Sequence, residues 1–207
     1  MNLTNKKRIL VFISGMVILT LGAALTIKAD LGAGSWDSVN VGLRDKFGLS
    51  IGTFAFIIGV FMTIIAGILR KGKFNFYTLI TAFGLGYLTD FWMFILNIIP
   101  ISENIYIRYL YFVLGIIVLS TGLGIYLIPN LAPNSLDDCM MAFRERFNLS
   151  VGVSKIISDM IGIIIALSLS GPIGFGTIIL TLVIGPLTNL SYNKFSKILL
   201  DNKIVVN

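Results

Sequence analysis

Six long apolar runs constrain this chain more than any other feature of its sequence. They cover about residues 9–28, 51–69, 74–99, 109–128, 151–170 and 172–193. Each is close to the ~20 residues that an α-helix needs to cross the ~30 Å hydrocarbon core of a bilayer. Only 13% of the residues are charged, well below the share in a typical soluble domain. The sequence therefore predicts an all-α, polytopic membrane protein with six transmembrane helices, the first of them retained and not cleaved as a signal peptide.

The composition also excludes several kinds of chemistry. The chain has no histidine and a single cysteine, Cys139, which removes histidine acid–base catalysis, disulfides and cysteine-cluster metal sites. We therefore expect no catalytic residues, no metal, no cofactor and no enzyme activity. The net charge of +6 lies in short clusters beside the apolar runs, a pattern that is typical of membrane flanks and not of a nucleic-acid-binding face.

The two halves of the chain resemble each other. The stretch "LGAGSWDSVNVGLRDKFGLSIG" starts at Leu31, and "LAPNSLDDCMMAFRERFNLSVG" starts at Leu131. The match extends without a gap over residues 8–69 and 108–169, and continues after one deletion. We interpret residues 1–207 as a single membrane domain with repeat one at 8–98 and repeat two at 108–195. Because each repeat holds three spanning helices, the second should be inverted in the membrane.

The basic residues give an independent orientation. With the N-terminus in the cytoplasm, twelve of the 16 Lys and Arg residues lie on the inner side, as the positive-inside rule requires. We therefore expect a multi-pass protein of a bacterial cytoplasmic membrane with both termini cytoplasmic. The inner residues are Lys6, Lys7, Arg8, Arg70, Lys71, Lys73, Arg144, Arg146, Lys155, Lys194, Lys197 and Lys203.

Each repeat also contains a polar segment that is too charged to span. The apolar residues within it recur at helical spacing, which predicts short amphipathic helices near 35–47 and 135–147. Ser35 and Ser135 are the expected N-caps, and Gly48 and Asn148 the expected left-handed C-terminal residues. Whether these helices are interfacial or re-entrant stays open.

Asp37 and Asp137 fall in the first turns of these short helices. One interpretation is that a carboxylate there complements the positive end of the helix dipole and does nothing more. The other makes both residues cation or proton contacts, because Gly and Pro breaks at matching places in two inverted halves indicate a transporter site. The two interpretations are compatible.

Charged residues inside the apolar runs are a second signal. Asp90 and Asp159 lie within spanning segments, where a carboxylate is costly and usually faces protein or water. Asn189 occupies the place of Asp90 in the second repeat, and these two could form a central polar patch. The alternatives are solvation of Asp90 near the surface or pairing with a neighbouring helix, and local pairing of Asp159 with Lys155. The neighbouring hydroxyls that would join the patch are Thr89 and Thr188.

The pattern "ADLGAGSWDSVNVGL…FGLSIGT" after a first spanning helix resembles the YczE/YyaS/YitT family of bacterial integral membrane proteins. The residues that carry the resemblance are Leu31, Gly32, Gly34, Trp36, Asp37, Gly42, Gly48 and Gly52. Ser35 departs from the pattern, because the family commonly has proline there. The resemblance implies a polytopic protein of bacterial cytoplasmic membranes and leaves its activity undefined.

Two classes of function fit these observations. The first is a small secondary transporter or channel for an unidentified small solute. The alternative is a non-transporting membrane scaffold or accessory protein. The expected partners are the lipid bilayer and a small-molecule or ion solute, with no nucleic acid and with a homodimer left open.

Overall fold

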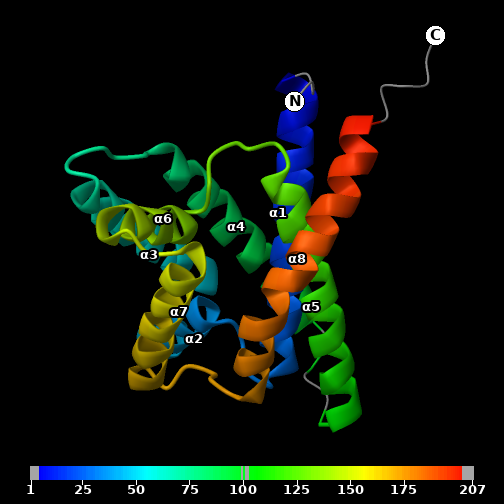
Figure 1. Ribbon diagram of the computed structural model, residues 1–207. Coiled ribbons are helices and arrows are strands. Elements are labelled where there is room, and N and C mark those ends of the chain that lie inside the picture. Colours follow the sequence, from blue (N-terminus) through cyan, green and yellow to red (C-terminus); the bar gives the residue numbers. More distant parts are fainter. Residues whose placement is uncertain (1–4, 99, 101–102, 202–207) are drawn as a thin grey trace.

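The computed structural model describes residues 5–98, 100 and 103–201, and over these residues it consists of eight α-helices without a strand (Figure 1). Six helices are long and apolar enough to cross a membrane, which confirms the predicted class. Ile99, at the end of the third predicted run, and Lys203 lie outside the described residues. The helices are α1 (Asn5–Ala29), α2 (Ser35–Phe47), α3 (Ile51–Leu69), α4 (Tyr77–Asn97), α5 (Ile105–Leu127), α6 (Ser135–Phe147), α7 (Val151–Ser168) and α8 (Phe175–Asp201).

The short helices α2 and α6 have the bounds that the sequence predicts. Both end at a residue in the left-handed conformation, Gly48 with φ 78° and Asn148 with φ 53°, whose backbone N–H bonds back into the last turn. The next helices then begin with serine N-caps. The Ser50 hydroxyl accepts a hydrogen bond from the Thr53 N–H, and Ser150 accepts one from the Val153 N–H, which satisfies a donor that the helix itself leaves free.

The last helix is longer than the apolar run that predicts it. The run ends near residue 193, whereas α8 continues to Asp201. Hydropathy identifies only the part of a helix that is apolar enough to lie in lipid. Residues 191–201, "SYNKFSKILLD", contain no glycine or proline that would stop the helix.

The helices form two packed groups (Figure 1). In the first, which we call the bundle, α2 packs on α3 and α7, and α6 packs on the same two helices. In the second, which we call the frame, α1 packs on α4 and α5, and α5 packs on α8. Helix α4 also packs on α3 and so joins the frame to the bundle.

Helices α1 and α5 cross each other closely. Glycines on each helix face the other helix so closely that an added methyl group would overlap backbone atoms, as in tightly packed membrane helices. The contacting residue numbers rise on one helix as they fall on the other, so the two helices run antiparallel (Figure 1). The contacts are Gly15 with Tyr126, Gly22 with Leu119, Gly115 with Thr26, and Gly122 with Leu19.

Candidate functional site

The first turns of α2 and α6 begin differently from the sequence-based expectation. Gly34 and Asn134 hold the N-cap positions, and neither helix has a side-chain capping bond. The prediction that Ser35 and Ser135 are N-caps is therefore wrong. Both serines are the first helical residues, and their hydroxyl groups bond to other helices instead.

Ser35 reaches from α2 to a carboxylate on α7. Its Oγ donates a hydrogen bond to Asp159 Oδ1 at 2.9 Å, and Lys155 Nζ lies 2.8 Å from the same oxygen. Asp159 is only 5% exposed, so the ion pair and the hydroxyl together stabilise a charge that burial alone would disfavour. The sequence left open a local pairing of Asp159 with Lys155, and the structure contains this ion pair. A second bond between the same helices runs from Trp36 Nε1 to Ser158 Oγ at 3.3 Å.

Asp37 lies in the first turn of α2 and makes no side-chain hydrogen bond among the described residues. A methyl group at Gly34 would come within 3.0 Å of Asp37 Oδ2, so the carboxylate folds back over the start of its own helix, where the dipole favours an anion. Its side chain is partly exposed. Burial raises the pKa of Asp37 to about 6, although the nearby charge of Lys155 acts in the opposite direction.

Asp137 has a matching environment at the start of α6. Burial raises its pKa, Lys155 opposes the shift, and Asp159 and Asp138 add to it. The charge of Lys155 therefore acts on the first-turn aspartates of both short helices, and α7 packs on both of these helices. We call Asp37, Asp137, Lys155 and Asp159 the charged cluster.

The first turn of α6 is also bonded to the first half of the chain. Ser135 Oγ accepts a hydrogen bond from Thr63 Oγ1 at 3.1 Å and donates one to the Thr78 carbonyl at 3.3 Å. Further along α6, Arg70 pairs with Asp138 and with Glu145, each at 2.9 Å. These bonds fix α6 against the end of α3.

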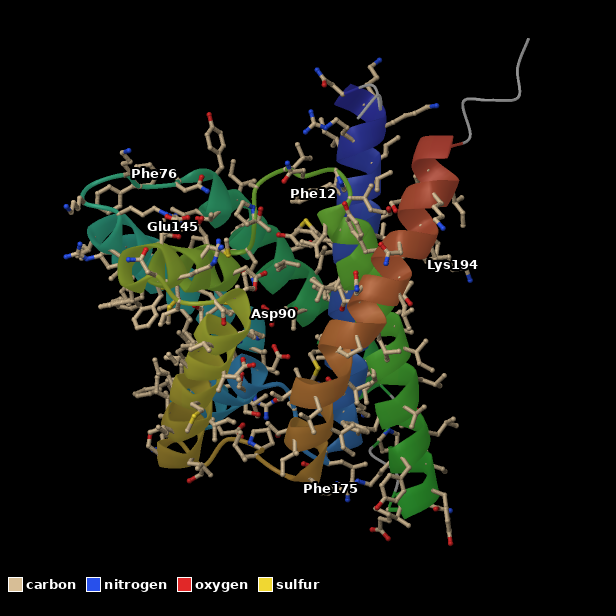
Figure 2. All side chains as sticks on the ribbon, in the orientation of Figure 1. Phe12, Phe76, Asp90, Glu145, Phe175 and Lys194 are labelled. Carbon is tan, nitrogen blue, oxygen red and sulfur yellow. The ribbon has the colours of Figure 1, made fainter. Side chains whose placement is uncertain are left out.

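Asp90 is held by the N-terminus of α3. Its carboxylate accepts a hydrogen bond from Ser50 Oγ at 2.5 Å and one from the Gly52 N–H at 2.7 Å. Figure 2 shows Asp90 near the middle of the molecule in this view. The sequence left open that Asp90 pairs with a neighbouring helix, and the structure contains this pairing.

Asp90 and Asn189 do not form the central patch that their equivalent positions predicted. Asn189 is exposed, and its Oδ1 accepts a hydrogen bond from Asn193 on its own helix. The free N–H groups at the start of α3 are stronger partners for a carboxylate than a distant amide. Thr89 is partly buried beside Asp90, and the buried Thr188 hydroxyl has no hydrogen-bond partner in the described part of the chain.

Sequence analysis missed two groups that complete this arrangement. The sequence spacing pairs Lys155 only with Asp159, and its influence on Asp37 and Asp137 arises from helix packing that leaves no trace in the sequence. The bonds from Arg70 to Asp138 and Glu145 were also not foreseen. The spacing of the two acids along one face of α6 was the available signal for a cation nearby.

Six apolar helices, with polar side chains joining them at their ends, define a multi-pass membrane protein. Residues 6–193 match the model of a family described as a family of unknown function, DUF6198. The chain belongs to this family.

Individual relatives agree with that assignment. "Uncharacterized protein YyaS" of Bacillus subtilis (strain 168) is 31% identical over 83% of this chain and 85% of the relative. "Uncharacterized membrane protein YczE" of the same organism is 28% identical over 87% of this chain and 83% of the relative. An uncharacterized protein of Haemophilus influenzae is 23% identical over 93% of this chain and 86% of the relative. No solved structure gave a significant match.

The resemblance to YczE and YyaS is therefore confirmed. A further likeness to YitT stays a prediction.

Proposed function

We propose that this protein is a small secondary transporter or channel for a small solute, built as two inverted three-helix repeats with both termini in the cytoplasm. The observation that carries the proposal is the charged cluster. It combines the first turns of two interrupted segments from opposite halves of the chain with an ion pair on α7. Binding sites of inverted-repeat transporters are built in this way.

The contacts between α1 and α5 support the inverted repeat. Gly15 with Tyr126 and Gly115 with Thr26 are the same contact with the halves exchanged, because the residue numbers differ by 100 in both cases. Such exchange between antiparallel helices is expected for a two-fold axis across their crossing. The packing of α2 on α7 has its counterpart in the packing of α6 on α3.

Backbone conformation supports the repeat independently. Left-handed φ angles recur at equivalent positions of the two halves, although the residue types differ. Since non-glycine residues rarely adopt this conformation, matched occurrences point to one chain path used twice. The pairs are Asp30 with Asn130, Gly48 with Asn148, and Lys71 with Ser170.

The charges of the cluster favour a cation or a proton as the solute or the coupling ion. Three carboxylates and one ammonium group carry a net negative charge when all are ionised, which attracts cations. Asp37 and Asp137 lack the bonded partners that stabilise Asp159, so they remain available to a solute. The proposal makes the protein a non-enzymatic partner of the bilayer and of a small solute, with no nucleic acid involved.

Flux measurements test this function. The full chain would be reconstituted into liposomes, and proton, Na⁺ and K⁺ fluxes would be followed under an imposed membrane potential. We expect flux above that of protein-free liposomes, and a large loss in Asp37→Asn and Asp137→Asn. The matched control is Asp45→Asn, which removes an exposed carboxylate of α2 that pairs with Arg44.

Absence of flux for all three cations would count against cation transport. An equally large loss of flux in Asp45→Asn would mean that the flux does not depend on the charged cluster. A folded protein without flux would favour the membrane scaffold or accessory protein.

A further inference from the structure

The frame contacts the bundle differently in the two halves of the chain. In the first half, α4 packs along α3, and Gly52 lies so close to Gly86 that a methyl group on either would overlap the backbone of the other. Asp90 closes this contact by bonding Ser50 and the Gly52 N–H. Ile51, between these two residues, is only 3% exposed.

The second half keeps the serine and both glycines at the equivalent places, as Ser150, Gly152 and Gly185, and lacks the contact. In the described part of the chain, α8 packs on α5 and not along α7. A methyl group at Gly152 or at Gly185 would have no neighbour within 4 Å. Val151, the equivalent of Ile51, is 49% exposed. The start of α7 thus has a serine cap and a glycine, as α3 does, with no side chain from α8 seated on it.

The ribbon view shows the same difference at larger scale (Figure 1). Helix α4 lies against the bundle, whereas α8 runs beside α5 and diverges from α7. Of the two helix pairs that the repeat makes equivalent, α3 with α4 and α7 with α8, only the first is packed in the described part of the chain, and α4 adds a smaller contact with α6.

We propose that the bundle exchanges between two alternative contacts with the frame. The side chains of Asp90 and Asn189, which we call the latches, each stabilise one of these contacts. In the arrangement described above, Asp90 holds the start of α3. In the other, Asn189 accepts hydrogen bonds from the Ser150 hydroxyl and the Gly152 N–H, while α3 separates from α4. This inference rests on the inverted repeat of the proposed function, and it adds the moving parts and the residues that bias them.

The difference between the two latches explains which contact is occupied. A carboxylate at a helix N-terminus forms charge-assisted hydrogen bonds and benefits from the helix dipole, whereas a carboxamide accepts neutral bonds only. Asp90 therefore favours the first-half contact. Exchange of the two side chains should shift the preference toward the second-half contact, because the serine cap and the glycine to which they would bond are present at both helix starts.

Thiol labelling can follow this exchange. In a Cys139→Ser background, single cysteines would be placed at Ile51 and at Val151, and the detergent-solubilised full chain would be labelled with a maleimide. With the native latches, the cysteine at 151 should react much faster than that at 51. In the double variant Asp90→Asn/Asn189→Asp, we expect the ratio of the two rates to fall by about tenfold or to invert, as one charge-assisted bond in place of a neutral bond predicts.

Cysteines at Phe47 and Phe147 serve as the control. These equivalent residues are 66% and 53% exposed, and their labelling rates should not change with the latch exchange. Unchanged rates at 51 and 151 in a folded double variant would overturn the proposal.

A second measurement covers the case in which the double variant does not fold. With Asp90 left in place, cysteines at Ser150 and Asn189 should form an intramolecular disulfide under oxidant as the minor arrangement is visited. No disulfide, or only dimers linked between chains, would overturn the exchange. Neither measurement requires a solute, so flux without exchange would contradict only the latches, and exchange without flux would contradict only transport.

Discussion

The carboxylates of Asp159, Asp90 and Asp37 are all at least partly removed from water, and each has different partners. Asp159 has a lysine and a hydroxyl, and Asp90 has the N-terminus of a helix. Asp37 has only the dipole of its own helix and the more distant charge of Lys155. A carboxylate without hydrogen bonds is the least stabilised of the three. A residue in that state is suited to bind a solute or a proton at the expense of stability.

The pH dependence of stability should reveal this property of Asp37. Because its pKa rises from 3.8 to about 6 on folding, the folded state binds more protons, and stability is lost as the pH rises through this window. Asp37→Asn should therefore match wild type near pH 4 and be more stable at pH 8, by up to about 3 kcal/mol. Thermal unfolding in detergent between pH 4 and 8 measures the difference.

The exposed Asp45 provides the comparison for that titration. Its pair with Arg44 lies at the surface, where ion pairs contribute little, so Asp45→Asn should leave the stability close to that of wild type. If Asp37→Asn were less stable than wild type at pH 8, its carboxylate would have a stabilising partner that the structure does not contain.

Local bonds of single residues could be predicted from the sequence, and distant ones could not. Gly48 and Ser50 act within four residues of their own positions, so their roles follow from short motifs. Ser35 has an equally good capping motif, yet its hydroxyl bonds to Asp159, which is 124 residues away. No local rule separates a serine that caps its own helix from one that reaches another.

At the scale of elements, helices α3 and α7 begin in similar ways. Both have a serine cap followed by glycine, but Ser50 also donates a hydrogen bond to Asp90. The α2 and α6 bounds were predictable because a left-handed glycine or asparagine and a serine cap follow each helix. The end of α8 was not, since polar residues that suit a helix give no stop signal.

Paired serine substitutions should separate capping from latching. Ser150→Ala removes one capping bond and should cost about 1 kcal/mol. Ser50→Ala removes the same bond and a charge-assisted bond to Asp90, so it should cost about 2–3 kcal/mol. Unfolding midpoints in detergent compare the two. Equal losses would mean that Asp90 does not stabilise the start of α3.

Helix pairs offer a second test at this scale. Gly22→Ala and Gly122→Ala each place a methyl group on the backbone of the partner helix, so both should destabilise the α1–α5 crossing by roughly 1–3 kcal/mol. Gly185→Ala adds a methyl group where no atom lies within 4 Å and should be neutral or slightly stabilising. Measured unfolding midpoints would contradict the close crossing if all three variants behaved alike.

For the whole molecule, the sequence predicted the spanning helices and not their grouping. Apolar length is a property of each segment alone. The division into frame and bundle depends on contacts between halves, and these are specified by shape at many side chains. Equivalence within a repeat was also a poor guide to proximity, as Asp90 and Asn189 show. The proposed two-fold axis would bring equivalent residues together only near itself, where α1 and α5 cross.

Orientation in the membrane remains a prediction that the distribution of basic residues makes. Phe47 and Phe147 end the two short helices at equivalent, exposed positions, so the inverted repeat should place them on opposite sides of the membrane. In a Cys139→Ser background, an impermeant maleimide added to intact cells should label a cysteine at 47, and one at 147 only after the membrane is opened. A cysteine at Lys6 should behave like that at 147, because both termini are expected inside. Labelling of 47 and 147 from the same side would rule out the inverted repeat, and with it the exchange of latches between two equivalent halves.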